Sequence, residues 1–160
     1  MRTETGMLAL MVMLKSFQRL GYFVALESVP TAIIAHLRKC LNFSAKVTAI
    51  PSLRSRRYYQ TAIRTYLDVK PYDQTASKLA ATVIARTALV MEHPADLLNV
   101  AIEELVKERY ELPAFSTLDR LVGHIRAVTN NRLLGSGLYF GWTVEKYFRY
   151  SLESIRELPP

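Results

Sequence analysis

The chain has 160 residues, half of them apolar and 22% charged, a balance that excludes a disordered chain because it supplies enough apolar side chains for a core. The net charge of +7 is typical of nucleic-acid-binding proteins but is not specific to them. Cys40 is the single cysteine, which excludes an intramolecular disulfide and a cysteine-cluster metal site and indicates a reducing, cytoplasmic location.

An apolar run of eight residues, 7–14, opens the chain. A membrane-spanning helix needs about 20 such residues, so the run is too short to cross a bilayer. Glu4 precedes it, and Lys15 and Arg19 follow it at helical spacing, a pattern that favours a buried helix over a signal peptide. We therefore expect no membrane partner.

The spacing of apolar residues predicts helices throughout the chain and no sheet. Local signals support the boundaries: Gly21 is a helix stop, Pro30 and Pro51 each mark a helix start, and Ser44 is a candidate cap for a short helix. The expected helices cover about 5–20, 30–41, 44–50, 51–68, 74–92, 95–110, 117–132 and 142–157. The predicted fold is an all-α, compact bundle of seven or eight helices with helix-turn-helix-like units.

Most of the expected helices have a predicted apolar side. On the helix at 51–68 it consists of Tyr59, Ala62, Ile63, Tyr66 and Leu67. The helix at 74–92 is apolar nearly all round, including Leu89 and Val90, and is therefore expected to be central. On the helix at 95–110 the inward residues are Leu97, Leu98, Ala101, Leu105 and Val106.

Residues 1–134 read as one helical region, and the sequence leaves open whether they form a single core or two lobes, 1–70 and 71–134. Gly135, Ser136 and Gly137 predict a flexible joint after this region. Residues 135–160 are then a separate tail that contains the last predicted helix.

No catalytic motif is present in the sequence. His36, His93 and His124 fall on separate helices or at a helix end, which argues against a metal site. The acidic residues of segment 103–111 alternate with Lys107 and Arg109, as on a solvated helix face. We therefore expect no enzyme activity, no catalytic residue, no metal and no cofactor.

The densest basic stretch is RSRRYYQTAIRTYLD, residues 54–68. Arg54, Arg57, Thr61 and Arg64 follow one another three or four residues apart and share a helix face. Guanidinium groups bind phosphate oxygens in pairs of hydrogen bonds, so this face is a candidate surface for binding the phosphates of a nucleic acid. A basic face that pairs with acidic residues of a neighbouring helix fits the spacing equally well.

Residues 97–132 predict a helix-turn-helix unit, in which two amphipathic helices are joined by Leu-Pro-Ala-Phe. In such a unit the start of the second helix reads base edges in the major groove. The polar residues at that start, off the apolar stripe, are Ser116, Thr117, Arg120 and His124.

Several separate pieces of the sequence resemble the N-terminal region of class II (Tn-three type) replicative transposases. These pieces, in order, are LKSFQRLGYF, ESVPTAIIAHLRKCLNF, RSRRYYQTAIRTYLDVKPYD and ELPAFSTLDRLVGHIR. The resemblance covers roughly residues 7–134. It implies an all-helical bacterial region that binds the terminal inverted repeats of a transposon, whereas catalysis belongs to a domain much further along such chains.

The residues that match the family's motifs are Arg54, Arg56, Arg57, Tyr58, Gln60 and Arg64 in the basic helix and Ser116, Thr117 and Arg120 in the later one. We infer DNA contacts at these positions, Tyr58 excepted, from their charge and helix face, and add His124 on the same ground. The expected partner is double-stranded DNA, in a cytoplasmic, nucleoid-associated protein.

Residues 135–160 do not resemble the family's continuation. The chain is therefore also interpretable as a truncated or frameshifted transposase. The alternative to DNA binding is a helical protein-interaction or dimerisation module, in which the apolar first and last helices bind a partner or a second copy of the chain.

Overall fold

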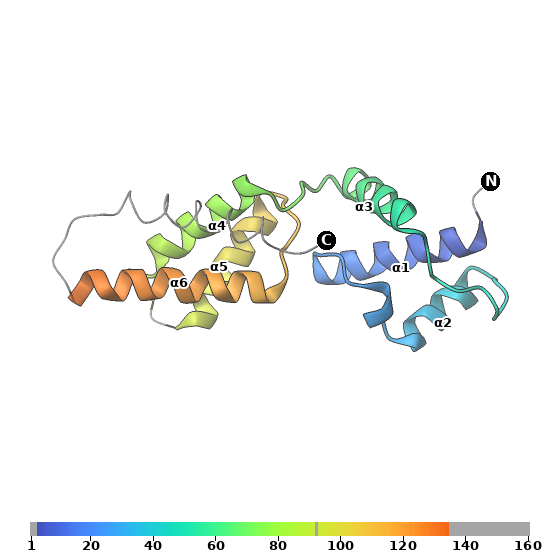
Figure 1. Cartoon of the computed structure of the whole chain (residues 1–160), viewed down its shortest axis with the longest axis horizontal. Helices are drawn as coiled ribbons and strands as arrows, with labels where there is room; N and C mark the ends of the chain where they lie inside the picture. The colour runs from blue at the N-terminus through green and yellow to red at the C-terminus, as the bar shows by residue number, and fades with distance from the viewer. Residues whose placement is uncertain (1–2, 92, 135–160) are drawn as a thin grey trace. The chain divides into compact units, whose positions relative to one another are not determined.

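The computed structural model describes residues 3–91 and 93–134 (Figure 1). These residues form six α-helices and one short 3-10 helix, and no strand occurs among them. The all-α fold is thereby confirmed, although the described range has six α-helices where the sequence predicted seven. The predicted helix at 142–157 and the tail 135–160 lie outside the described residues.

The chain divides into two compact units. The first contains the residues up to Asp73 together with Leu105–Ala114, and the second contains Gln74–Glu104 and the residues from Phe115 onward. The sequence left open a division into two lobes, 1–70 and 71–134. In the structure, segment 105–114 belongs to the first unit and not to the second.

Helix α1 (Glu4–Leu20) is the centre of the first unit. Thr3 caps its start, where the hydroxyl oxygen accepts a hydrogen bond from the backbone N–H of Gly6 at 3.2 Å. Helices α2 (Thr31–Cys40) and α3 (Leu53–Leu67) both contact α1, which lies between them in Figure 1. The buried core comprises Leu8, Ala9, Val12, Met13, Phe17, Leu26, Val29, Ala49 and Ile63.

Gly21 ends α1 in the left-handed conformation, with φ of 77°. Its N–H donates to the carbonyl of Phe17 at 2.8 Å, and its own carbonyl accepts from the N–H of Leu112 at 2.8 Å. A Cβ at this position would lie 2.9 Å from Cδ1 of Leu112. The glycine therefore both ends the helix and permits segment 105–114 to approach it closely.

Gly21→Ala is expected to lower the free energy of unfolding by about 1–2 kcal/mol, because an L-residue is strained at this φ and Leu112 must also move. Urea denaturation followed by circular dichroism measures the loss. Gly123→Ala is the matched control, since a Cβ there meets nothing within 4 Å; it should be neutral or stabilising. Equal midpoints for the two variants would contradict the prediction.

The second unit contains α4 (Gln74–Thr87), most of α5 (Pro94–Lys107) and α6 (Phe115–Leu134). Helices α4 and α6 are in contact and lie side by side in Figure 1. Its buried apolar side chains come from all three helices and are Ala76, Ala80, Ala81, Val83, Ile84, Ala85, Leu97, Leu98, Ala101, Leu118, Leu121 and Val122.

The short helix predicted at 44–50 does not form. Ser44 starts a turn instead, in which its carbonyl accepts from the N–H of Val47 at 3.0 Å. The residues that follow up to Pro51 have no regular secondary structure, and Ile50 is disfavoured in helical geometry because it precedes Pro51. Ser52 caps α3, which therefore begins after Pro51 and not at it.

Some residues predicted to be inward are exposed. Helix α4 ends at Thr87 instead of 92, so Leu89 and Val90 lie beyond it and are 58% and 82% exposed. Val106 is exposed on the last turn of α5. The prediction that these side chains are buried is wrong, because periodicity shows neither the residue at which a helix ends nor whether its last turn is covered by a neighbour.

The inward side of α3 is also rotated from the prediction. Arg56, Ile63 and Leu67 define it, and Tyr66 lies roughly a quarter of a turn away at 3.6 residues per turn. Tyr66 is therefore exposed, and Ala62, predicted to lie on the apolar stripe, is exposed as well.

Candidate nucleic-acid interface

Helix α3 is the most basic element among the described residues. Leu53–Leu67 contains four arginines and no acidic residue. The hydroxyl oxygen of Ser52 accepts from the N–H of Ser55 at 3.2 Å and caps the start. Asp68 closes the end in the left-handed conformation, with φ of 53°. These two caps stabilise both ends of a short helix that has a high density of positive charge.

The positive charge of the chain belongs to the first unit. That unit has thirteen lysines and arginines against six acidic residues, which equals the whole net charge of +7. The residues of the second unit balance at eight of each sign. Attraction of a polyanion is therefore concentrated on the unit that carries α3.

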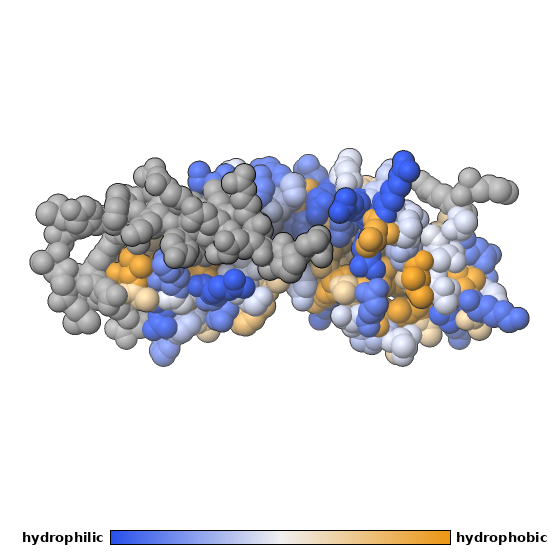
Figure 2. Space-filling model, viewed as in Figure 1, coloured by the Kyte–Doolittle hydropathy of each residue, from blue (hydrophilic) through white to orange (hydrophobic). Residues whose placement is uncertain are grey.

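The solvent side of α3, here called the α3 outer face, combines arginines with threonines and tyrosines. In Figure 2 the surface over α3 alternates strongly hydrophilic residues with paler ones. The side chains of Arg54 and Arg57 form no ion pair or hydrogen bond with any described residue and are exposed. The α3 outer face consists of Arg54, Arg57, Tyr58, Thr61, Ala62, Thr65 and Tyr66.

Arg56 points to the interior side of α3 and pairs with Glu27. Its Nη2 donates to Oε1 of Glu27 at 3.0 Å. The pKa of Glu27 is lowered from its ordinary value of 4.5, first by hydrogen bonding to its own backbone N–H and second by the hydrogen bond from Arg56. Arg56 thus connects α3 to the 3-10 helix η1 (Leu26–Ser28).

Arg56→Gln is expected to raise the pKa of Glu27 part of the way towards 4.5, because the larger contribution, the backbone hydrogen bond, remains. A lowered carboxyl pKa contributes stability that is present above the unfolded pKa and is lost as the pH falls through the folded pKa. NMR titration of the Glu27 side-chain carboxyl carbon in both proteins measures the change. An unchanged titration midpoint would contradict the assigned pair.

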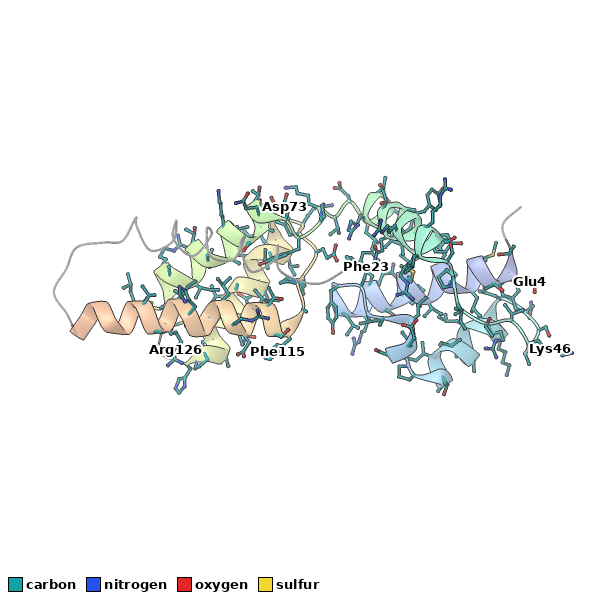
Figure 3. The ribbon with its side chains drawn as sticks, viewed as in Figure 1. Glu4, Phe23, Lys46, Asp73, Phe115 and Arg126 are labelled. Atoms are coloured by element: carbon teal, nitrogen blue, oxygen red, sulfur yellow. The ribbon has the colours of Figure 1, made fainter. Side chains whose placement is uncertain are left out.

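Arg64 lies on the flank of α3 and is turned towards segment 105–114. Its Nε donates to Oε2 of Glu111 at 2.7 Å, and the two side chains are only 25% and 14% exposed. The guanidinium also lies over the ring of Phe23, 5.0 Å from the centroid, and Phe23 packs on Phe17 at 4.6 Å. Phe23, labelled in Figure 3, thus lies where α3 meets α1.

Segment 105–114 is fastened to the end of α3 by backbone hydrogen bonds. The N–H of Lys70 donates to the carbonyl of Arg109 at 2.7 Å, and the N–H of Glu111 donates to the carbonyl of Lys70 at 2.8 Å. Arg109 also pairs with Asp68 at 2.8 Å, and the ammonium of Lys70 lies 4.9 Å from the ring centroid of Tyr110. The Arg64–Glu111 pair is the least exposed part of this junction.

The basic residues selected from the sequence therefore separate into two groups. Arg54 and Arg57 lie on the α3 outer face, whereas Arg56 and Arg64 are paired with acidic residues of the same unit. Gln60 is half-buried between these two sides. The structure thus brings Arg54 and Arg57 together and turns Arg56 and Arg64 inward.

The second group of predicted contacts lies on α6. Ser116, Thr117, Arg120 and His124 are all exposed, as expected from the apolar stripe. Leu118, Leu121 and Val122 are buried on the other side of the helix. These four residues belong to the unit whose charges balance.

Sequence reasoning missed four members of the α3 outer face, Tyr58, Ala62, Thr65 and Tyr66, and it missed Glu111 as the partner of Arg64. Periodicity could have found Thr65, since it lies one turn after Thr61. No local signal indicates Glu111, because it is 47 residues from Arg64.

The described residues contain neither a metal-binding cluster nor a membrane-spanning helix. No group of three or more histidine, cysteine or acidic residues there is placed to hold a metal ion. Within the same ranges no helix combines the length and the apolar character needed to span a membrane.

The described ranges define an all-helical protein whose positive charge is concentrated in one unit, on a helix with an unpaired basic face. A family model described as a domain of unknown function, DUF4158, matches residues 1–125. Because the match covers most of the chain, the protein belongs to this family. No curated protein and no solved structure matches the chain.

Proposed function

We propose that this chain binds duplex DNA as the N-terminal recognition region of a class II (Tn-three type) replicative transposase and is not itself catalytic. The observation that supports this most directly is the α3 outer face, where Arg54 and Arg57 are exposed without acidic partners on the unit that has all of the net positive charge.

Duplex DNA is the polyanion that best fits a rigid basic helix. Arg54 and Arg57 lie one helical turn apart, roughly 4.5 Å along the axis at 1.5 Å per residue. Two guanidinium groups at this separation are able to contact neighbouring phosphates of one strand, and each phosphate contact adds to a salt-dependent affinity. The exposed start of α6, from Ser116 to His124, supplies the second proposed contact, to base edges.

The transposase assignment rests on the resemblance of separate segments. LKSFQRLGYF covers the end of α1, the arginine-rich segment covers α3, and LPAFSTLDRLV covers the start of α6. The proposed ligand within that assignment is the terminal inverted repeat of the transposon, in a nucleoid-associated protein.

Fluorescence anisotropy with a terminal inverted-repeat duplex and a scrambled duplex, at two salt concentrations, tests the proposal. The expected result is tighter binding to the repeat, with an affinity that falls steeply as salt rises. Equal, salt-sensitive binding to both would restrict the function to phosphate binding. An absence of binding to either duplex at low salt would refute it.

A second candidate, a protein-interaction or dimerisation module, is favoured by one observation. Leu89, Val90 and Met91 are consecutive exposed apolar residues just after α4. Exposed apolar side chains in a row are typical of contact surfaces. Sedimentation across a concentration series tests it, and a dimer with no DNA affinity would favour it over DNA binding.

A further inference from the structure

The hydroxyl groups of Thr61 and Thr65 are directed to the backbone of α3. Thr61 Oγ1 donates to the carbonyl of Arg57 at 3.2 Å, and Thr65 Oγ1 donates to the carbonyl of Thr61 at 3.0 Å. The threonine Cβ bears one hydroxyl and one methyl group. With each hydroxyl held against the helix, the methyl group is the outer substituent that these exposed residues offer to a ligand.

The rest of this part of the α3 outer face has the same character. Ala62 is exposed and adds a third methyl group. Tyr58 and Tyr66 are exposed by 66% and 74% and flank the three methyl-bearing residues. The α3 outer face therefore has two regions, a cationic one at Arg54 and Arg57 and a methyl-rich one from Thr61 to Thr65.

We propose that the methyl-rich region of the α3 outer face recognises thymine in the major groove of duplex DNA, through contact of the Thr61, Ala62 and Thr65 methyl groups with the thymine C5-methyl group. This inference rests on the proposed DNA-binding function. It adds recognition of bases to a helix that the sequence predicted only to contact phosphates. The major groove is wide enough to admit an α-helix, and the thymine methyl is the apolar group that threonine and alanine methyls contact there.

The dimensions of the helix suit this contact. Thr61 and Thr65 are separated by roughly 6 Å along the axis, whereas base pairs are stacked about 3.4 Å apart. The two threonines therefore span two to three neighbouring base pairs. Arg54 and Arg57 lie towards the other end of the same face, where they reach the phosphates that border the groove.

Charge favours DNA over a protein as the ligand of this face. An apolar protein surface would bury the methyl groups equally well, but it would leave Arg54 and Arg57 without anionic partners. Helix α3 contains no acidic residue, and the whole net charge of +7 belongs to its unit. A DNA groove supplies both the phosphates and the methyl groups.

The test uses two fluorescent hairpin duplexes of the same alternating adenine–thymine sequence, one of them with uracil in place of every thymine. Uracil lacks only the C5-methyl group, so base pairing and phosphate charge are the same in both. The full chain is expected to bind the thymine duplex about five-fold more tightly, the factor that burial of a single thymine methyl group implies.

Two double variants then locate the contact. Thr61→Ser/Thr65→Ser keeps both hydroxyl groups and removes two of the three methyl groups, leaving that of Ala62, so it should lose most of the preference for thymine and bind the uracil duplex with unchanged affinity. Thr61→Val/Thr65→Val keeps outward methyl groups and should retain the preference. Circular dichroism confirms that both variants keep the helical content of the parent chain.

The outcomes separate this inference from the function on which it rests. Equal affinity of the parent chain for both duplexes, or a thymine preference that is undiminished in the serine variant, would overturn methyl recognition by α3 and leave DNA binding standing. An absence of binding to both duplexes at low salt would overturn DNA binding as well.

Discussion

Replacing Arg54 and Arg57 together with alanine is expected to weaken binding to every duplex sequence by roughly 100-fold at low salt. Each arginine is assigned one phosphate contact, which contributes about 1.4 kcal/mol, a factor of ten in affinity. Both side chains are exposed and have no partner among the described residues, so the fold should be unaffected. Anisotropy titrations at several salt concentrations measure both the affinity and its salt dependence.

The salt dependence is the more diagnostic of the two results. Loss of two phosphate contacts should reduce the slope of log affinity against log salt by about two. Lys15→Ala/Arg19→Ala is the matched control, because it removes the same charge from exposed positions of α1 in the same unit. If both double variants bind equally, net charge and not the α3 outer face governs binding, and the proposed interface is wrong.

Arg64→Ala is expected to lower the free energy of unfolding by about 2 kcal/mol. The change leaves the carboxylate of Glu111, only 14% exposed, without its hydrogen-bond donor. It also removes the guanidinium from the ring of Phe23, 5.0 Å away. Urea denaturation of the variant and the parent chain, under the same conditions, measures the difference.

Arg57→Ala is the control for this second prediction. It removes an arginine from the same helix, but one that is exposed, so its effect on stability should stay within about 0.5 kcal/mol. Arg64→Ala/Glu111→Ala should recover part of the loss, since no carboxylate is then left unpaired. Arg64 would instead belong to the DNA-contacting face if its removal weakened DNA binding and left stability unchanged.

The proposed functional surface was only partly predictable from the sequence. The spacing of Arg54, Arg57 and Thr61 indicated a shared helix face, and these three residues do lie together on the α3 outer face. Arg64 was placed on that face by the same spacing. Its position on the flank allows the side chain to reach Glu111, and the spacing of residues on one helix does not reveal such a partner.

The exposed start of α6 was predictable for a local reason. The apolar stripe consists of Leu118, Leu121 and Val122, where Leu121 and Val122 follow Leu118 by three and four residues. All three side chains are buried, as expected. Ser116 and Arg120 lie off the stripe and are exposed. Amphipathic periodicity decides such positions because one side of the helix is packed and the other is solvated.

The sequence by itself determined the helical class and most helix positions, because these depend on interactions within a few residues. Thr3 and Ser52 cap helices, Gly21 ends one in the left-handed conformation, and Pro51 restricts the residue before it. The same locality explains the failure at 44–50, where a capping serine was present but Pro51 disfavours helical geometry at the residue before it.

Only the tertiary structure decided which arginines are available to a ligand. Arg56 and Arg64 have acidic partners 29 and 47 residues away, and the second of these lies on a segment that returns to the first unit from beyond α5. Long-range pairing depends on how the chain folds back on itself. Four similar arginines in one helix therefore become two exposed cations and two internal ones.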